Sequence, residues 1–358
     1  MKLLWIFLFS FLYMGLSARP NDKGHTYRYI LGLSGGTIWG HNAPVYHLAH
    51  SHPLYYWAEF QIQKPSKEWS RAWNHPIWGF GISVLDFRSP VLGKSVLAIT
   101  YLEPRLWKSF TYRIGTGCSF QTHPFNSDGN STNLMLGSHF AMVMHAQLNW
   151  YLALGPKTGL RLGWGITHLS NGAFAQPNSG VNSFFLSAGL SLKNQAKPFP
   201  AGDSVASPAF RKGFSVLLSS SIALVEKFPV SGPKYPVFQI HGRFQYRLGR
   251  KSTLSIGLDW KKNTTVAALI EDNPELGSSS SVLGLPLGHE LHISSVSLIT
   301  EMGFYILKHH DVFPDLYQRY GLRKYWSENC FTAIYLSTHR AKAECLEWTV
   351  GYKWSKKP

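Results

Sequence analysis

The 358-residue sequence has few cysteines and few charged residues, and both shortages exclude classes of protein. Its three cysteines, Cys118, Cys330 and Cys345, are an odd number and form no disulfide framework, which excludes a small disulfide-stapled scaffold. Only 15% of the residues are charged, although the net charge is +16. Because the basic residues are scattered and no nucleic-acid motif is present, we expect no nucleic-acid partner.

The sequence also lacks a long apolar run after its N-terminus, which excludes membrane-spanning helices of about 20 residues. Residues 1–18, MKLLWIFLFSFLYMGLSA, combine Lys2, the apolar stretch Leu3–Met14 and a small-residue end, so we predict a cleaved signal peptide. Aromatic residues are nevertheless abundant, with 13 Trp, 17 Tyr and 22 Phe. A chain that meets lipid without helices must form a closed β-barrel, in which every backbone group is paired.

Apolar and polar residues alternate with a period of two through much of the remaining chain. In 136–150, for example, Phe140, Leu148 and Trp150 alternate with His145 and Gln147. Several segments reach the 9–11 residues or so of a membrane strand, and their polar faces suit a polar lumen. The predicted strands are 27–34, 55–63, 77–87, 95–102, 106–118, 135–151, 158–170, 181–192, 213–225, 235–248, 251–260, 292–307, 328–338 and 344–354.

This pattern predicts an all-β fold, a transmembrane antiparallel β-barrel of about 12–14 strands and at least eight. Segments rich in Pro, Ser and Asn are predicted loops; they are 36–53, 119–133, 194–212, 262–290 and 308–327. Because no linker interrupts the chain, we expect residues 19–358 to form a single outer-membrane barrel domain. Its oligomeric state is left open.

The stretch GITHLSNGAFAQPNSGVN, residues 165–182, places polar side chains on an apolar strand face. His168 and Ser170 continue the face of Trp164 and Ile166, which looks outward toward lipid in a barrel. Residues i and i+2 share one face of a strand, about 6.6 Å apart at Cα. If the hairpin closes about residue 176, Ser170 lies opposite Asn182. Such a cluster offers a Ser nucleophile, a His base and a group that orients the imidazole.

Two runs, His168-Leu-Ser170-Asn171 and Pro177-Asn178-Ser-Gly180, resemble the signature of the lipid A 3-O-deacylases, the PagL or acyloxyacyl hydrolase family of outer-membrane barrels. Further similarity lies in Asn133-Leu-Met-Leu-Gly137-Ser138 and patchily in the tail from Tyr320 to Trp354. The resemblance is best over 130–192. It implies an outer-membrane enzyme that removes the ester-linked 3-O-acyl chain of lipid A, so lipid A or lipopolysaccharide is the expected substrate and outer-membrane lipid the expected surroundings.

The resemblance also implies a role for each matching residue. Ser170 is the expected nucleophile, His168 the base and Asn182 the residue that orients it, with no cofactor. Asn171 is expected to help stabilise the oxyanion. Site-shaping roles fall to four residues of the following turn: Gly172, Pro177, Asn178 and Gly180.

The sequence departs from the short family members in two respects. They carry Glu at the place of Asn182, and a neutral amide stabilises imidazolium less well than a carboxylate does. They also form eight-stranded barrels, whereas this chain contains more predicted strands. Two alternatives therefore stay open: a non-catalytic channel or structural barrel with a degenerate site, and a phospholipase or acyltransferase that uses the same Ser–His pair.

No metal site is predicted. His309, His310 and Asp311 are adjacent in sequence, and three adjacent residues seldom converge on one ion. The acidic residues of the 262–290 loop form a weak candidate for Ca²⁺ between lipid phosphates.

Overall fold

The computed structural model describes residues 26–40, 43–63, 68–73, 75–194, 212–227, 230–340 and 342–355, and every structural statement below refers to these. About two-thirds of them lie in antiparallel strands and the four helices among them are short, which confirms the predicted all-β barrel class. The predicted signal peptide, residues 1–18, lies outside the described residues. No helix in the described part of the chain is long and apolar enough to cross a membrane.

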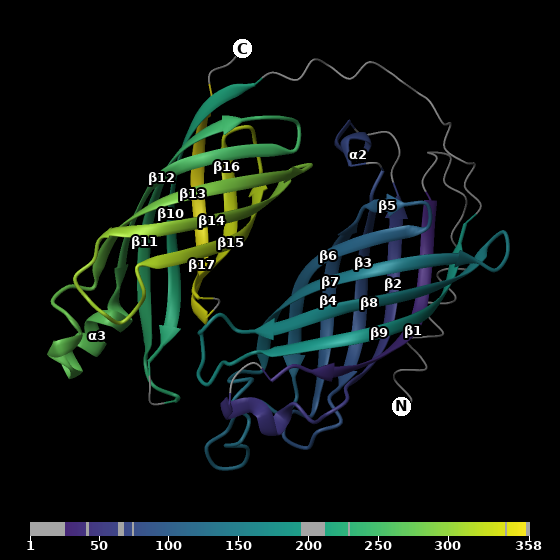
Figure 1. The fold of residues 1–358 in the computed structure, drawn as a ribbon, viewed down its shortest axis with the longest axis horizontal. Coiled ribbons are helices and arrows are strands. Elements are labelled where there is room, and N and C mark those ends of the chain that lie inside the picture. Colours follow the sequence, from purple (N-terminus) through teal and green to yellow (C-terminus); the bar gives the residue numbers. More distant parts are fainter. Residues whose placement is uncertain are drawn as a thin grey trace. The chain divides into compact units, whose positions relative to one another are not determined.

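The first barrel contains eight strands and a short additional one (Figure 1). Hydrogen bonds connect β4-β3-β2-β1-β9-β8-β7-β6, and pairing of β4 with β6 closes the ring. The short β5, Arg105–Trp107, pairs only with β6. The eight barrel strands are β1 Thr26–Ile38, β2 Leu54–Gln63, β3 Ile77–Asp86, β4 Lys94–Glu103, β6 Phe110–Gln121, β7 Phe140–Ala153, β8 Thr158–Ser170 and β9 Val181–Lys193.

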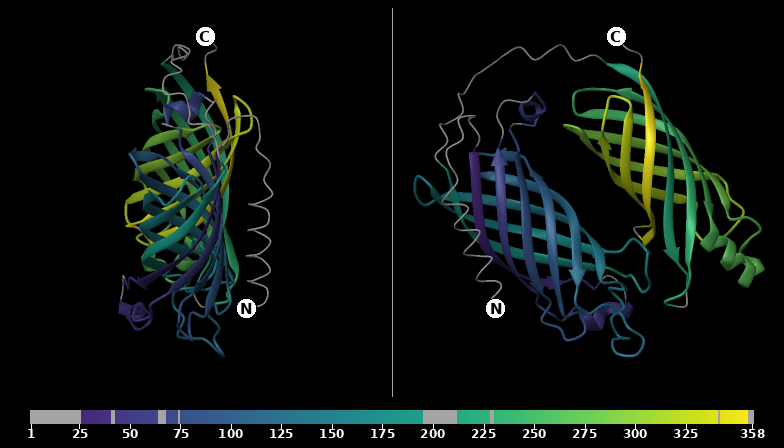
Figure 2. Two further views of the ribbon diagram at one scale, coloured as in Figure 1. Left: turned by 90° about the vertical axis from the view of Figure 1, so that its right-hand side faces the viewer. Right: turned by 180° about the vertical axis from the view of Figure 1, so that it is seen from behind.

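A second barrel closes independently, because the last strand, β17, pairs with β10 (Figure 2). Its eight strands follow one another around the ring in sequence order. They are β10 Gly213–Glu226, β11 Lys234–Arg247, β12 Ser252–Asn263, β13 Ser281–Ile293, β14 Val296–Leu307, β15 Leu316–Tyr325, β16 Cys330–His339 and β17 Lys342–Ser355. Four short helices lie in connections: η1 Ala43–Leu48, α2 Glu68–Ala72, α3 Thr264–Asp272 and η2 Pro274–Leu276.

The expectation of one barrel of 12–14 strands is therefore wrong, because β9 returns to β1 and β17 returns to β10. Two strands, β13 and β15, lie in segments predicted as the loops 262–290 and 308–327. In β13, Pro286 and two nearby glycines are residue types that favour loops, so this segment was predicted as a loop. In β15 the lumen-facing positions are occupied by Arg319 and Arg323, so its polar composition concealed its alternation.

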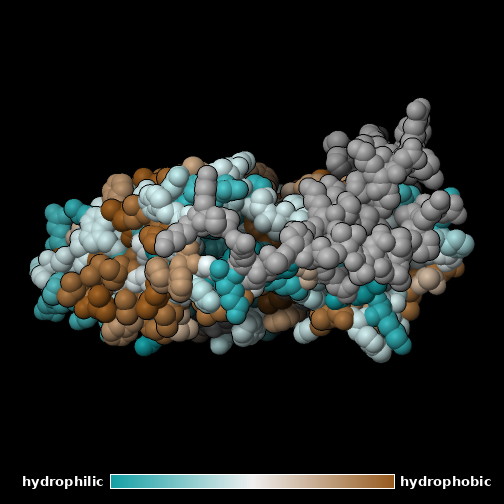
Figure 3. Space-filling model, turned by 90° about the horizontal axis from the view of Figure 1, so that it is seen from above, coloured by the Kyte–Doolittle hydropathy of each residue, from teal (hydrophilic) through white to brown (hydrophobic). Residues whose placement is uncertain are grey.

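Side chains of opposite character cover the two surfaces of each barrel. The lumen of the first barrel is polar and buried: Arg113 forms ion pairs with Glu59 and Glu103, at 2.8 Å in both cases. On the outside, Trp164 and Leu186 are more than half exposed. In Figure 3, which shows one face of the molecule, patches of brown, apolar side chains lie between teal, polar ones. Outward apolar and inward polar faces are the arrangement of a barrel surrounded by hydrocarbon.

The two ends of the first barrel differ in their connections. At one end, which we call the long-loop end, the strands are joined by 39–53, 87–93, 122–139 and 171–180. The opposite end carries both ends of the barrel's chain and the connections 64–76, 104–109 and 154–157. Loops pack over the long-loop end, where Val45 of η1, Met135 and Leu169 belong to one buried apolar core. This core gives the loops a rigid base.

Candidate active site

The strand pair β8–β9 presents the predicted site on the outside of the first barrel, at its long-loop end. Along β8 the side chains of Arg161 and Thr167 are buried in the lumen, whereas Trp164 is exposed on the outer face. His168 and Ser170 lie four and six residues after Trp164, and side chains an even number of residues apart lie on the same face of a strand. They therefore share the outward face of Trp164, as predicted. Asn182 stands on the corresponding face of β9.

The cross-strand register differs from the predicted one by two residues. Asn182 lies opposite His168 rather than Ser170, and Phe184 lies opposite Ile166. The cause is the connection 171–180, which closes the hairpin one residue earlier than assumed. A shift of two residues leaves each side chain on its predicted face, because the side-chain period of a strand is two. The change brings His168 and Asn182 into direct contact.

His168 and Asn182 form a short hydrogen bond, with Nδ1 of the imidazole 2.7 Å from Oδ1 of the amide. An amide oxygen only accepts, so Nδ1 carries the hydrogen when the imidazole is neutral. The lone pair is then on Nε2, and the ring can act there as a base. Asn182 thus fixes the tautomer that a Ser–His mechanism needs, but as a neutral amide it supplies no negative charge to stabilise imidazolium.

Ser170 is the last residue of β8, and the Asn178 amide of the following loop contacts its hydroxyl. Asn178 Nδ2 donates to Ser170 Oγ over 3.0 Å. The same side chain accepts from the backbone N–H of Asn171 through Oδ1, at 3.1 Å. Asn171 in turn donates from Nδ2 to Ser138 Oγ at 3.0 Å. Asn171, which was predicted to help stabilise the oxyanion, and Asn178, which was predicted to shape the site, therefore lie next to Ser170.

The loop that carries Asn178 is attached to a second loop by backbone hydrogen bonds. Gly180 N donates to Met135 O at 2.9 Å, and Ser179 N donates to Leu134 O at 3.2 Å. The amide oxygen of Asn133 accepts from Met135 N and Leu136 N and holds this second loop in shape. Asn133 was not predicted as a site residue. The run Asn133–Ser138 was its only sequence signal, since nothing local shows which loop it supports.

The remaining predicted residues lie in the same loop. Gly172 has a φ of +64° and Gly180 a φ of +75°, in the left-handed region that favours glycine. Pro177 is buried beside Asn178. Gly180 has a further constraint, because a Cβ atom there would lie 3.0 Å from Cε1 of His168 and 3.0 Å from the backbone oxygen of Leu169. The position thus needs glycine both for its backbone and for the imidazole.

Gly180→Ala is expected to reduce any activity of the site by a larger factor than it reduces stability. The left-handed conformation costs a residue with a Cβ about 1–2 kcal/mol, and the methyl group displaces the imidazole from Asn182. Gly93→Ala is the matched control, because Gly93 also has a positive φ, of +61°, but contacts His123 and not His168. Rates and thermal unfolding of both variants should be compared. Equal rate losses in the two would contradict the placement of Gly180 against the base.

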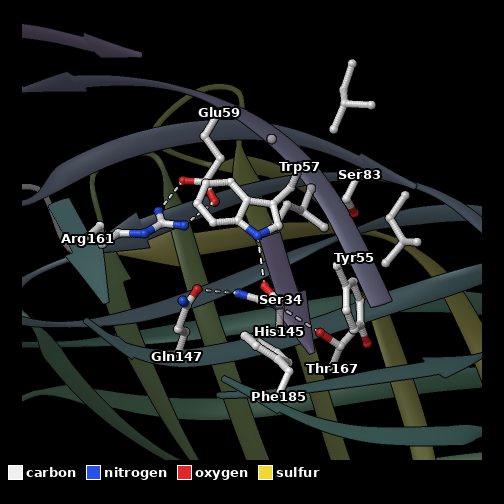
Figure 4. Close-up of a pocket in the computed structure, with 14 residues that line it drawn as sticks. Ser34, Tyr55, Trp57, Glu59, Ser83, His145, Gln147, Arg161, Thr167 and Phe185 are labelled. Carbon is white, nitrogen blue, oxygen red and sulfur yellow. Dashed lines mark hydrogen bonds and ion pairs between the residues drawn. The ribbon is translucent and has the colours of Figure 1, made fainter. Parts of the chain in front are cut away.

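A small interior cavity in the first barrel is a separate feature (Figure 4). It has about 40 Å³, and its lining includes Tyr55, His145 and Phe185. His145 Nδ1 is 3.1 Å from Thr167 Oγ1, and Trp57 donates to Ser34 Oγ at 2.8 Å. A volume of this size holds about one water molecule and excludes an acyl chain.

The second barrel contains a Ser–His–Asp arrangement that sequence reasoning missed. Ser221 Oγ is 2.8 Å from His241 Nε2, and His241 Nδ1 is 2.7 Å from Asp259 Oδ1. Arg319 Nη2 also contacts His241 Nε2, at 3.0 Å, and competes for the lone pair that a base would use. Ser221, His241 and Asp259 are all buried in the lumen, and the interior of an eight-stranded barrel is just wide enough for its side chains. The arrangement is part of the packed ionic interior.

No group of three or more His, Cys, Asp or Glu residues in the described ranges is placed to hold a metal ion. The three cysteines are unpaired, with Cys345 buried and the other two exposed. His310 is buried, and its neighbour Asp311 donates its backbone N–H to Leu276 O at 2.8 Å.

Each barrel matches a model of a known protein family. A family model described as lipid A 3-O-deacylase (PagL) matches residues 54–191. A model described as acyloxyacyl hydrolase, C-terminal domain, matches residues 213–357. The first range contains β2–β8 and most of β9, and the second contains β10–β17. No curated protein sequence matches the chain.

Solved structures with some likeness are bacterial barrels. CdiB from Acinetobacter baumannii has 8% identity and a TM-score of 0.19; the alignment covers 92% of this chain, which spans 60% of CdiB. A porin variant from Rhodopseudomonas blastica has 9% identity and a TM-score of 0.20, with 92% of this chain and 99% of the porin covered. These scores are too low to support any inference about this chain.

Proposed function

Because the chain belongs to the lipid A 3-O-deacylase (PagL) family, we propose that its first barrel is an outer-membrane hydrolase that removes the ester-linked 3-O-acyl chain of lipid A. The observation that carries the proposal is the hydrogen bond from His168 Nδ1 to Asn182 Oδ1, two residues from Ser170 on the outward face. The bond leaves the lone pair of the imidazole on Nε2, and Ser170 lies two residues farther along the same face of the strand. Both residues lie on the outward face of β8 at the long-loop end of the barrel, where His168 is partly exposed and Ser170 is buried.

The end of the barrel on which the site lies supports lipid A as the substrate. In single-chain outer-membrane barrels the longer loops are extracellular and the turns on the periplasmic side are short. His168, Ser170 and Asn182 all lie at the long-loop end. The site would therefore be in the outer leaflet, where lipid A resides. A phospholipase that acts on the inner leaflet would need its site at the opposite end.

The reaction in this proposal has two steps. Ser170 Oγ attacks the acyl carbonyl carbon while His168 Nε2 takes the hydroxyl proton. The tetrahedral intermediate then expels the sugar 3-oxygen, which receives that proton and leaves an acyl-enzyme. Water, activated by the same imidazole, attacks the acyl-enzyme and releases the fatty acid and Ser170. No cofactor takes part in these steps.

Developing negative charge on the carbonyl oxygen needs hydrogen-bond donors. Asn178 Nδ2, which donates to Ser170 Oγ at 3.0 Å, is the best-placed side-chain donor. The backbone N–H of Asn171 is already bound to Asn178 Oδ1, so the Asn178 amide must shift before Asn171 N can serve. We therefore assign the oxyanion contact primarily to Asn178, and to Asn171 the positioning of the loop through Ser138.

Mass spectrometry of lipid A tests the proposal. Lipid A from cells that produce the protein should lack one 3-O-hydroxyacyl chain, and the free hydroxy fatty acid should appear; cells without the protein are the control. Fatty acid released from glycerophospholipid instead would identify a phospholipase, and an acyl chain moved to another lipid would identify an acyltransferase. Unchanged lipids in cells with folded, membrane-inserted protein would favour the non-catalytic barrel.

A further inference from the structure

A row of side chains on the outer wall of the first barrel runs through the candidate active site. The neighbouring strands β7, β8 and β9 contribute Met144, His168 and Asn182, which lie opposite one another in the strand register. The next member is Trp39, which directly follows β1. Its backbone N–H donates to the backbone oxygen of Asn182 at 2.8 Å. Trp39 therefore lies two strands from His168, about 10 Å between Cα atoms.

Trp39 is an exposed aromatic residue whose backbone is held on both sides. It lies six residues after the exposed Leu33, so it shares the outward face of β1, and 55% of its surface is exposed. Its indole packs on Phe184, with ring centres 6.0 Å apart. The next residue, Gly40, lies so close to η1 that a Cβ atom there would be 2.8 Å from Tyr46. The indole is thus a supported flat surface beside the candidate active site.

The reaction proposed above arranges three groups around the acyl carbonyl carbon. The carbonyl oxygen belongs beside Asn178, and the leaving sugar oxygen must lie within reach of His168 Nε2, which gives it a proton. The acyl chain takes the third direction. Met142 and Met144 lie opposite Ser170 and His168 on β7, and flexible thioether side chains suit a mobile acyl chain. The sugar is then left with the other side of His168, toward β9 and β1.

We propose that Trp39 binds the sugar ring of lipid A that carries the scissile ester, and thereby positions the ester at Ser170. The faces of a pyranose ring present C–H bonds, which pack well on the electron-rich face of an indole. Trp also suits the boundary between lipid and water, which is where the sugar headgroup lies. The inference rests on the proposed deacylase function and deepens it, because it assigns a specificity-determining residue to the same site.

A tryptophan at this boundary can also serve as a general membrane anchor, and the two roles lead to different expectations. An anchor stabilises the barrel in the membrane, so its loss affects all substrates equally. A residue that binds the sugar affects the discrimination between esters with and without a sugar, which is a ratio of kcat/KM values. The backbone hydrogen bond from Trp39 to Asn182 is present in every side-chain variant, so the register of the strands is retained.

Steady-state kinetics on two esters test the proposal. One substrate is purified lipid A, and the other is the ethylene glycol ester of the same 3-hydroxy fatty acid, which has no sugar. Trp39→Leu should lower the ratio of kcat/KM for lipid A to kcat/KM for the glycol ester about tenfold, chiefly through a higher KM for lipid A. Trp39→Tyr keeps a flat aromatic ring and should keep most of the ratio.

Trp78→Leu is the matched control. Trp78 is an exposed tryptophan on the outer face of β3, at the opposite end of the same barrel, and its substitution should leave the ratio as in wild type. An unchanged ratio in folded Trp39→Leu, or an equal loss of activity on both esters, would overturn the inference while the deacylase proposal stands. A folded wild-type protein that hydrolyses neither ester would overturn the deacylase proposal and the inference with it.

Discussion

Ser170→Ala is expected to lower the rate of lipid A deacylation by about 10⁴- to 10⁶-fold, the range seen when a serine hydrolase loses its nucleophile. The reason is that the acyl-enzyme cannot form without Oγ, and Asn178 and the loop can then do no more than hold the substrate. The variant should remain folded, because the hydroxyl lies at a strand end and its described partner Asn178 also binds Asn171 N. Initial rates on purified lipid A in mixed micelles are the measurement.

Ser179→Ala is the matched control, since Ser179 lies in the same loop and its backbone N–H, which the substitution leaves intact, holds the loop to Leu134. It should retain activity close to that of wild type. A Ser170→Ala protein that still releases hydroxy fatty acid would show that another nucleophile acts. The buried Ser221 could then be examined by the corresponding substitution.

Asn182→Asp is expected to raise the deacylation rate by about 10²- to 10⁴-fold, up to the factor by which the reverse change slows a serine protease. Asp is isosteric with Asn, so one carboxylate oxygen can keep the 2.7 Å contact with His168 Nδ1. The gain comes from the negative charge, which stabilises the imidazolium formed when Ser170 loses its proton. The measurement is kcat and KM on the same substrate, and the effect should appear in kcat.

Asn182→Ala provides the opposite test, because it removes the acceptor and releases the imidazole tautomer. The deacylation rate of this variant should fall below that of wild type. A wild-type rate in both variants would mean that Asn182 does not orient His168 during the reaction. A loss of activity in Asn182→Asp would mean that a charge next to lipid at this position is worse than a neutral amide, and that the amide suits the present site.

The alternation of side chains between the two faces of a strand made part of the site predictable. Because side chains alternate along a strand, His168 and Ser170 had to share a face with Trp164, and Asn182 had to share the matching face of β9. The predicted faces were correct although the predicted register was wrong, because a register error of two residues leaves each side chain on the same face. The hydrogen bond from His168 to Asn182 was not predictable in the same way. It depends on where the loop 171–180 turns, and the loop is held by the distant residues Leu134 and Met135.

The sequence by itself determined the all-β class, the inward and outward faces of most strands and the outward face that His168, Ser170 and Asn182 share. All of these follow from local alternation with a period of two. Only the tertiary structure decided that β9 returns to β1 and β17 to β10, so that the strands close as two rings of eight. It also decided that β13 and β15 are strands. Barrel closure depends on which distant strands pair, and no local pattern specifies that.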